Sequence, residues 1–195
     1  MLKRLMDIVV SLVGLAVVSP LLLAVAILIK RDSPGPVFYR GERVGRFGKP
    51  FKIYKFRTMV VGADKLGGPS TAADDTRLTK LAGFLKKYQL DELPQLINVL
   101  KGEMSLVGPR PEVPLYVNMF TKEEAILSVR PGMTDYASLW DFHEGEILKG
   151  SADPEKTYME EIRPEKIRLQ LKYVREHSLW VDLKIILKTL GKVFS

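Results

Sequence analysis

The sequence predicts a predominantly helical α+β protein with a membrane-embedded helix–break–helix at its N-terminus. Two observations support this fold class. Residues 8–29 form an uncharged apolar run of 22 residues, and residues 51–58 alternate between apolar and basic side chains ahead of several helix start and stop signals. We therefore divide the chain into a membrane anchor at residues 1–31 and one lobe at residues 32–195, whose amphipathic helices lie at the membrane surface.

The apolar run is long enough to cross a hydrocarbon core of about 30 Å as a straight helix. However, Ser19 and Pro20 interrupt it near the middle, where a proline bends a helix. Basic pairs at residues 3–4 and 30–31 flank both ends, and such flanks prefer the cytoplasmic side. We expect a re-entrant anchor with both ends cytoplasmic. A straight span is the alternative, while a cleaved signal peptide would have a shorter run.

The segment after the anchor predicts a small β-hairpin. Residues 37–40 and 51–58 are extended in character and enclose a turn with several glycines. The hairpin places Lys55 and Arg57 on one of its strands.

Helices are expected over three later regions. Asp75 can cap a helix at residues 76–87, and Gly102 can close a helix at residues 90–101. The chain is helical again from about residue 164. Its last stretch is amphipathic and suits an anionic membrane surface, or equally the side of the lobe. The apolar stripe consists of Leu183, Leu187, Leu190 and Phe194, and the basic stripe of Lys184, Lys188 and Lys192.

The composition restricts the partners. The chain of 195 residues has no cysteine, which excludes disulfides and thiolate zinc sites and suits a reducing compartment. Its net charge of +7 favours anionic partners such as nucleic acid, acidic lipid headgroups or phosphorylated small molecules.

Two adjacent carboxylates, Asp91 and Glu92, are the candidate catalytic residues. Pro94 places them in the first turn of a helix, where carboxylates also serve as ordinary caps. Cations that can converge on them favour chemistry on a polyphosphate bridged by Mg²⁺. These cations, the candidate phosphate ligands, are Lys55, Arg57, Lys86, Arg110 and Arg130. No Walker or dinucleotide-binding glycine motif is present.

The stretch LDELPQLINVLKGEMS at residues 90–105, followed by GPRP at residues 108–111, closely resembles the signature of bacterial sugar transferases, the monotopic phosphoglycosyl transferases. The resemblance extends to PGPVF at residues 34–38, FKIYKFRTM at residues 51–59, RPG at residues 130–132, and the Ser-Pro break of the anchor. It covers nearly the whole chain.

This resemblance implies an enzyme of the bacterial inner membrane with its catalytic lobe on the cytoplasmic face. It would transfer a phosphosugar from a UDP-sugar to polyprenol (undecaprenyl) phosphate through a covalent aspartyl intermediate, releasing UMP, as the first membrane step of glycan assembly. Asp91 would be the nucleophile and a Mg²⁺ ligand, and Glu92 a base or proton-handling partner. The expected partners are these two substrates and membrane lipids without nucleic acid, and a homodimer is left open.

Some residues depart from the family pattern. Lys86 stands where an arginine is common, so its charge is kept but its bidentate fork is lost. After the RPG motif the chain continues with Met133 and an acidic stretch that reaches Glu144 and Glu146. The rival interpretation is a membrane-tethered basic module that binds anionic lipid or nucleic acid without catalysis. It accounts for the positive charge but not for an acidic pair among cations.

Overall fold

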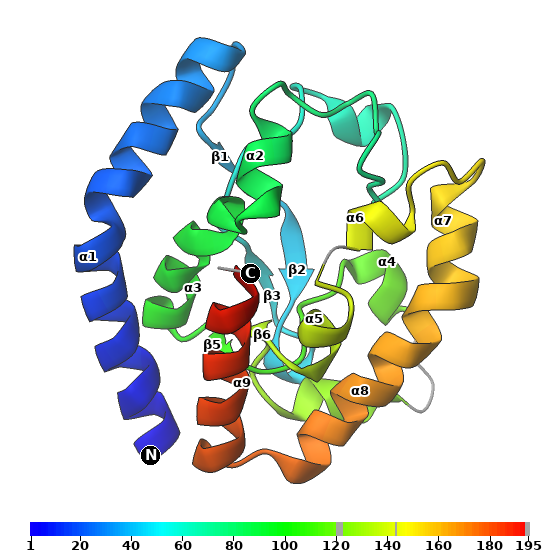
Figure 1. Ribbon diagram of the computed structural model, residues 1–195. Helices are drawn as coiled ribbons and strands as arrows, with labels where there is room; N and C mark the ends of the chain where they lie inside the picture. Colours follow the sequence, from blue (N-terminus) through cyan, green and yellow to red (C-terminus); the bar gives the residue numbers. More distant parts are fainter. Residues whose placement is uncertain (120–122, 143, 194–195) are drawn as a thin grey trace.

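The computed structural model of the protein describes residues 1–119, 123–142 and 144–193, and its helices surround three short two-stranded ladders (Figure 1). The predominantly helical α+β class is confirmed. The main helices are α1 (Leu2–Asp32), α2 (Ala82–Lys87), α3 (Leu96–Lys101), α4 (Pro114–Val117), α5 (Tyr136–Trp140), α6 (Glu144–Ile147), α7 (Pro154–Thr157), α8 (Arg163–Glu176) and α9 (Leu179–Val193). The strands are β1 (Phe38–Tyr39), β2 (Glu42–Val44), β3 (Pro50–Lys52), β4 (Lys55–Phe56), β5 (Ser105–Val107) and β6 (Gly132–Thr134).

The expected helix break at Ser19 and Pro20 is wrong, because α1 continues through both residues as one helix and bends instead (Figure 1). Pro20 has no backbone N–H, so the carbonyl of Ala16 loses its usual donor. The hydroxyl of Ser19 replaces it and donates to that carbonyl at 2.9 Å. The Ser-Pro pair therefore allows a bend without leaving an unsatisfied backbone group in an apolar segment.

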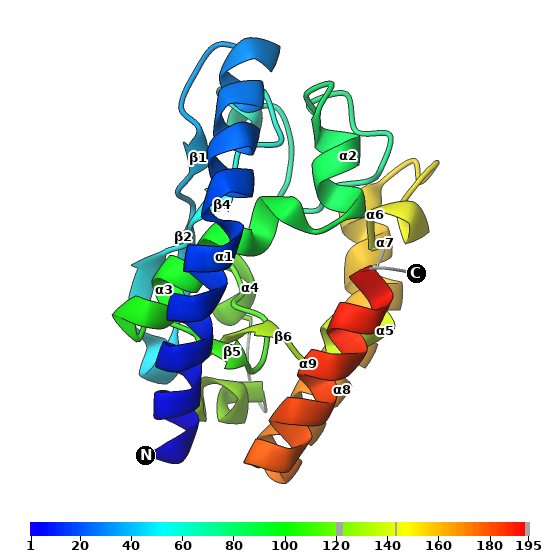
Figure 2. The same ribbon diagram turned by 60° about the vertical axis from the view of Figure 1, so that its left-hand side comes forward.

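Helix α1 lies along the lobe over its whole length (Figure 2). Its buried stripe includes Asp7, Ser11, Val25 and Ile29, spaced so that they share one face. The opposite face is apolar and exposed, and by length and composition α1 could cross a membrane. This exposed face consists of Leu2, Leu5, Val9, Val10, Leu12, Val13, Val17, Leu21, Leu23, Ile27 and Leu28.

Both ends of α1 are fixed to the same lobe. Near its start, the guanidinium of Arg4 donates to the carbonyls at the end of α3. The ammonium of Lys3 donates to Val107 O at 2.9 Å and pairs with the buried carboxylate of Asp182 on α9 at 2.5 Å. At the other end, Val25 and Ile29 pack against Phe56 and Leu85.

The β-hairpin is confirmed, but it consists of two separate antiparallel ladders, β2–β3 and β1–β4. Asn98 of α3 occupies the break between β3 and β4. Its side-chain oxygen accepts from Tyr54 N at 2.8 Å, and its side-chain nitrogen donates to Lys52 O at 3.0 Å. Asn98 is fully buried, so this side chain ties the hairpin to α3.

The two central helices differ from their expected form. The expected helix at residues 76–87 begins only at Ala82, because Asp75 binds Arg77 instead of capping a helix. The helix at residues 90–101 starts as a 3-10 helix, η3 (Leu90–Gln95), and continues as α3. Its closure by Gly102 is confirmed, since Gly102 has φ of +80°.

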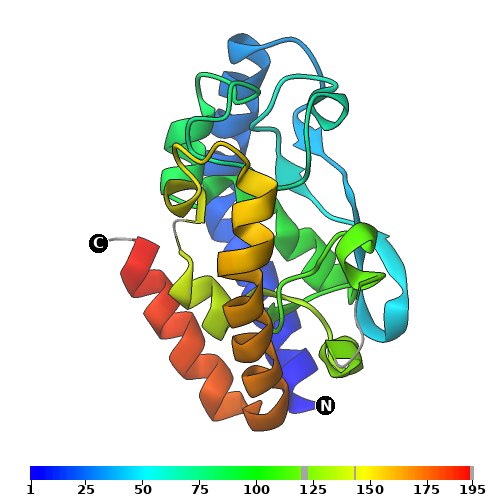
Figure 3. The same ribbon diagram turned by 90° about the vertical axis from the view of Figure 1, so that its right-hand side faces the viewer.

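The C-terminal helices α8 and α9 diverge from a short turn, and α5 lies between them (Figure 3). Leu183, Leu187 and Leu190 on α9 are exposed as the amphipathic pattern predicts, while Ile185 points into the core. Phe194, the last residue of that predicted stripe, lies outside the described residues.

Asp7 joins α1 to β5, and Asp7→Ala tests this contact. The Asp7 carboxylate is buried and accepts from Ser105 Oγ at 3.0 Å and from Leu106 N at 3.1 Å. Its loss leaves both donors unsatisfied, and we expect it to lower the stability by about 2–3 kcal/mol. Thermal unfolding in detergent micelles measures this. The matched control is Val10→Ala on the exposed face of α1; an equal shift of the two melting temperatures would contradict the assignment.

Candidate active site

The acidic pair lies at the start of η3, on the side of the lobe where the hairpin ladder β1–β4 packs. Gln89, just before η3, has φ of +54°, a left-handed conformation that non-glycine residues adopt at a cost of about 1–3 kcal/mol. This turn ends α2 and directs the chain into η3. Asp91 and Glu92 are both buried, with 7% and 8% of their surfaces exposed. Two adjacent carboxyl groups are thus held out of water.

Glu92 is saturated by two cations that come from distant segments. Lys55 of β4 donates to Oε1 at 2.7 Å. Arg110 forms a two-pronged ion pair that includes a contact to Oε2 at 3.0 Å. Burial alone would raise the pKa of Glu92, but Arg110 and Lys55 hold it far below its usual range. A carboxylate with so low a pKa is a poor base, and its two ion pairs suit Glu92 to hold Lys55 and Arg110 in position.

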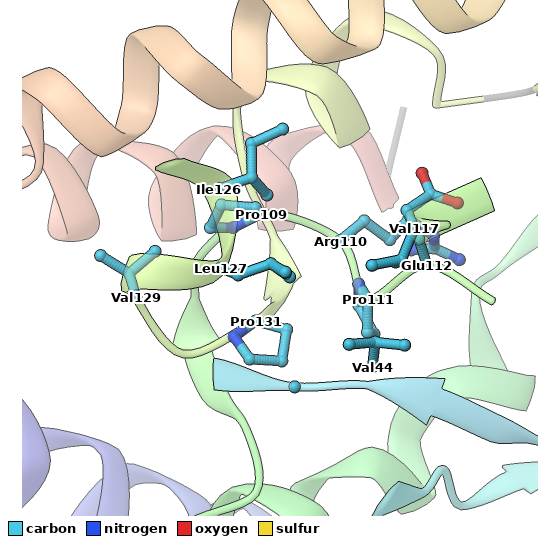
Figure 4. Close-up of a pocket in the computed structure, with 11 residues that line it drawn as sticks. Val44, Pro109, Arg110, Pro111, Glu112, Val117, Ile126, Leu127, Val129 and Pro131 are labelled. Atoms are coloured by element: carbon cyan, nitrogen blue, oxygen red, sulfur yellow. The ribbon is translucent and has the colours of Figure 1, made fainter. Parts of the chain in front are cut away.

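The backbone around Arg110 is held by a proline-rich apolar cluster (Figure 4). Pro109 and Pro111 pack beside Leu127 and Pro131, around a cavity of only about 10 Å³. This volume holds at most a single water molecule, so the cluster is packing and no ligand site. The side chain of Arg110 extends away from the prolines and reaches Glu92. The GPRP motif thus fixes the direction of its arginine.

Asp91 differs from Glu92 in having no hydrogen-bond donor. Across the described part of the chain, no group donates to its carboxylate, although the charges of Lys55, Arg110 and Lys86 act on it. Burial raises the pKa of Asp91 to about 6, and the neighbouring charge of Glu92 adds to the rise. The cations oppose this rise, so Asp91 is still mostly ionised at neutral pH. Asp91 titrates near neutrality and keeps its oxygens available.

Lys86 of α2 faces the acidic pair and has no ion-pair partner within 4 Å among the residues that the structure describes. It is half-buried, and burial lowers its pKa, an effect that the charge of Asp91 opposes. An ammonium group without a partner beside an unpaired carboxylate is suited to bind an incoming anion.

Two of the predicted phosphate ligands lie elsewhere. Arg57 is buried and donates to Pro36 O, to the side chain and carbonyl of Ser33, and to Met59 O. It therefore fixes the chain that leaves α1. Arg130 donates to Gly102 O at 3.0 Å, at the opposite end of α3 from the acidic pair. The structure thus groups only Lys55, Lys86 and Arg110 around Asp91 and Glu92.

A second charged cluster borders the site, and sequence reasoning did not identify it. Lys166 of α8 is buried and pairs with Glu144 at 2.7 Å and with Asp141 at 3.2 Å. Burial would lower its pKa, but Glu144 and the other nearby acids hold it well above the usual value. Asp141 and Glu144 also act on the charge of Arg110. No local sequence pattern distinguishes Lys166, since it is one of many lysines on amphipathic helices.

The site suits a metal ion that is shared with a substrate. Within the described ranges, no three acidic or imidazole side chains converge on one point. Mg²⁺ usually takes one or two carboxylates together with substrate phosphates and waters. The unpaired oxygens of Asp91 fit this kind of ligand set.

The sequence comparisons give one family and several related proteins. The family model described as bacterial sugar transferase matches residues 1–195. The chain is 37% identical over 199 residues to a UDP-N-acetylgalactosamine-undecaprenyl-phosphate N-acetylgalactosaminephosphotransferase of Aeromonas hydrophila, covering 100% of this chain and 44% of that protein. It is 39% identical over 199 residues to a UDP-glucose:undecaprenyl-phosphate glucose-1-phosphate transferase of Escherichia coli (strain K12), covering 100% of this chain and 40% of that protein.

A third relative matches over a shorter region. The chain is 48% identical over 122 residues to a putative undecaprenyl-phosphate N-acetylgalactosaminyl 1-phosphate transferase of Bacillus subtilis (strain 168), covering 63% of this chain and 68% of that protein. The chain therefore spans less than half the length of the Aeromonas and Escherichia relatives.

The different environments of the two carboxylates can be measured directly. We expect Asp91 to titrate near pH 6, protonated below and ionised above, while Glu92 stays ionised throughout the acidic range. In Glu92→Gln a neighbouring negative charge is lost, and Lys55 and Arg110 lose their bound carboxylate and act on Asp91 instead, so the pKa of Asp91 falls. NMR titration of ¹³C-labelled aspartates, with Asp91→Asn for assignment, gives the pKa of Asp91 in the unaltered protein and in Glu92→Gln. An unchanged or higher Asp91 pKa in Glu92→Gln would refute the coupling.

Proposed function

The chain belongs to the bacterial sugar transferase family, and from this premise we propose that it transfers a phosphosugar from a UDP-sugar to polyprenol phosphate through a covalent intermediate on Asp91. One observation carries the proposal. Of two adjacent buried carboxylates, Glu92 is saturated by Lys55 and Arg110, whereas Asp91 accepts no hydrogen bond in the described part of the chain. Asp91 is thus the group that can attack a substrate.

In the first step an oxygen of Asp91 attacks the β-phosphorus of the UDP-sugar. The new O–P bond forms as the bond from the β-phosphorus to the bridging oxygen breaks, and UMP leaves with that oxygen and its electron pair. With a pKa of about 6, Asp91 is roughly 90% ionised at pH 7, so no base has to activate it. Lys86 and the cations at Glu92 reduce the repulsion between two anions.

In the second step a phosphate oxygen of polyprenol phosphate attacks the same phosphorus. The bond between Asp91 and phosphorus breaks, and the carboxylate is regenerated together with a polyprenol diphosphate sugar. Glu92 touches no reacting atom in this scheme. It keeps Lys55 and Arg110 in place, because both cations are anchored to its carboxylate.

Mg²⁺, when bound by Asp91 and the substrate phosphates, would neutralise phosphate charge and make phosphorus more electrophilic. The protein's own contribution is the arrangement of the cations and the exclusion of water from the buried pair.

The exposed apolar face of α1 supports a membrane location, and we assign the lobe to the cytoplasmic face of the inner membrane. Both ends of α1 contact the same lobe, which suits a re-entrant anchor better than a straight span, because a span would place the ends on opposite sides. The exposed leucines of α9 would lie at the same surface. This location brings the site to the depth of a lipid phosphate, as the first membrane step of glycan assembly requires.

Asp91→Asn tests the covalent route. Incubation with Mg²⁺ and a UDP-sugar, without lipid, should add one sugar phosphate to the intact mass and release one UMP per protein. Asp91→Asn should show neither change, because an amide is a far weaker nucleophile. UMP release that requires lipid in the unaltered protein would instead indicate direct transfer, and binding without turnover for every UDP-sugar would favour the non-catalytic module.

The re-entrant topology predicts that both ends of α1 are accessible from the same side. Because the chain has no cysteine, Leu2→Cys and Asp32→Cys each provide a single reactive thiol. In intact cells both should resist a membrane-impermeant maleimide, and in inverted vesicles both should react. Labelling of the two positions from opposite sides would establish a straight span.

A further inference from the structure

A groove between α5 and α9 has features that the reaction on Asp91 does not use. It is open to solvent, has a volume of about 480 Å³, and combines an apolar floor with a basic rim. Its lining residues are Tyr136, Leu139, Trp140, Lys188, Gly191 and Lys192. Trp140 leaves 45% of its surface exposed here, which is costly for a large aromatic side chain without a partner.

The groove carries a positive charge at one edge. Lys188 and Lys192 are one helical turn apart on α9, and both are exposed. Lys192 donates to Leu139 O at 2.5 Å and lies 5.7 Å from the centre of the Phe142 ring, so it leans across the groove toward α5. Two ammonium groups above an aromatic and aliphatic floor match a molecule with an anionic head and an apolar body.

The groove is connected to the acidic pair through the segment that follows α5. The backbone carbonyl of Phe142 accepts from the side chain of Gln89 at 3.3 Å, and Gln89 precedes Asp91 by two residues. Asp141, in the same segment, pairs with Lys166 at the border of the site. Phe142 therefore stands between Lys192 on one side and the turn that begins η3 on the other.

On the opposite side the groove joins the apolar face of α9. Leu183, Leu187 and Leu190 are exposed along this helix, and they form the surface that we assign to the membrane. An amphiphile that moves from the membrane along α9 would reach the groove with its two lysines and its aromatic floor.

Resting on the proposed function, we propose that this groove receives the second substrate, polyprenol phosphate. The isoprene units next to the phosphate lie on Tyr136, Leu139 and Trp140. Lys188 and Lys192 guide the phosphate toward Asp91. A free phospholipid has a similar anionic head. A phospholipid is not a substrate of the second step, so the binding of polyprenol phosphate can be distinguished from phospholipid binding by its KM.

The two half-reactions separate this proposal from the proposed function. In Lys188→Gln and Lys192→Gln, the UMP burst without lipid should be unchanged, because the first step does not involve the groove. The KM for polyprenol phosphate in mixed micelles should rise about tenfold per lysine, as expected for one lost charge-assisted phosphate contact, and the KM for the UDP-sugar should stay constant. Lys184→Gln, on the same helix but outside the groove, should change neither constant.

A second variant blocks the groove without removing charge. A Cβ placed on Gly191 has no atom within 4 Å outside its own stretch of helix, so Gly191→Leu extends an apolar side chain into the groove that Gly191 lines. It should also raise the KM for polyprenol phosphate and leave the burst intact.

Three results would overturn the proposal. The first is an unchanged KM for polyprenol phosphate in both Lys188→Gln and Gly191→Leu. The second is an equal rise in Lys184→Gln, accompanied by weaker sedimentation with phosphatidylglycerol vesicles, since this would indicate general attraction to anionic lipid. The third is the absence of any burst and turnover in the unaltered protein, which refutes the proposed function and this inference together.

Discussion

The site depends on the ion pairs of Glu92 with Lys55 and Arg110. These three residues come from η3, from the hairpin and from the GPRP segment. Removal of one partner from such a buried group leaves an uncompensated charge and typically costs several kcal/mol. The pairing therefore both joins three segments and holds two cations within reach of the neighbouring Asp91.

This pairing also explains why two identical functional groups side by side behave differently. Lys55 and Arg110 both bind Glu92, so the charge of Glu92 is neutralised and its side chain is fixed. Asp91 receives only the longer-range field of these cations, which lowers its pKa. Burial and the charge of Glu92 outweigh that field and raise the pKa of Asp91 to about 6. Divergent pKa values in an adjacent pair are a known mark of divided roles, and here the division follows from which carboxylate the two distant segments reach.

The features that depend on neighbouring residues could be predicted from the sequence. The hairpin, the closure of α3 by Gly102 and the exposed stripe of α9 follow from local patterns, and the acidic pair at a helix start follows from Pro94. The contacts between distant residues could not be predicted. Arg57 and Arg110 look alike in sequence, yet one fixes the end of α1 and the other reaches Glu92, because only the packed chain decides which acceptor each meets.

The contact between Lys3 and Asp182 has a consequence for the biosynthesis of the protein. The two residues are 179 positions apart, and at about 5–20 residues per second the ribosome needs roughly 10–40 s to add the second after the first. During this interval the apolar first helix has emerged while α9 does not yet exist. The contact of α1 with α9 therefore forms late, after the exposed apolar face of α1 has had this time to meet a bilayer.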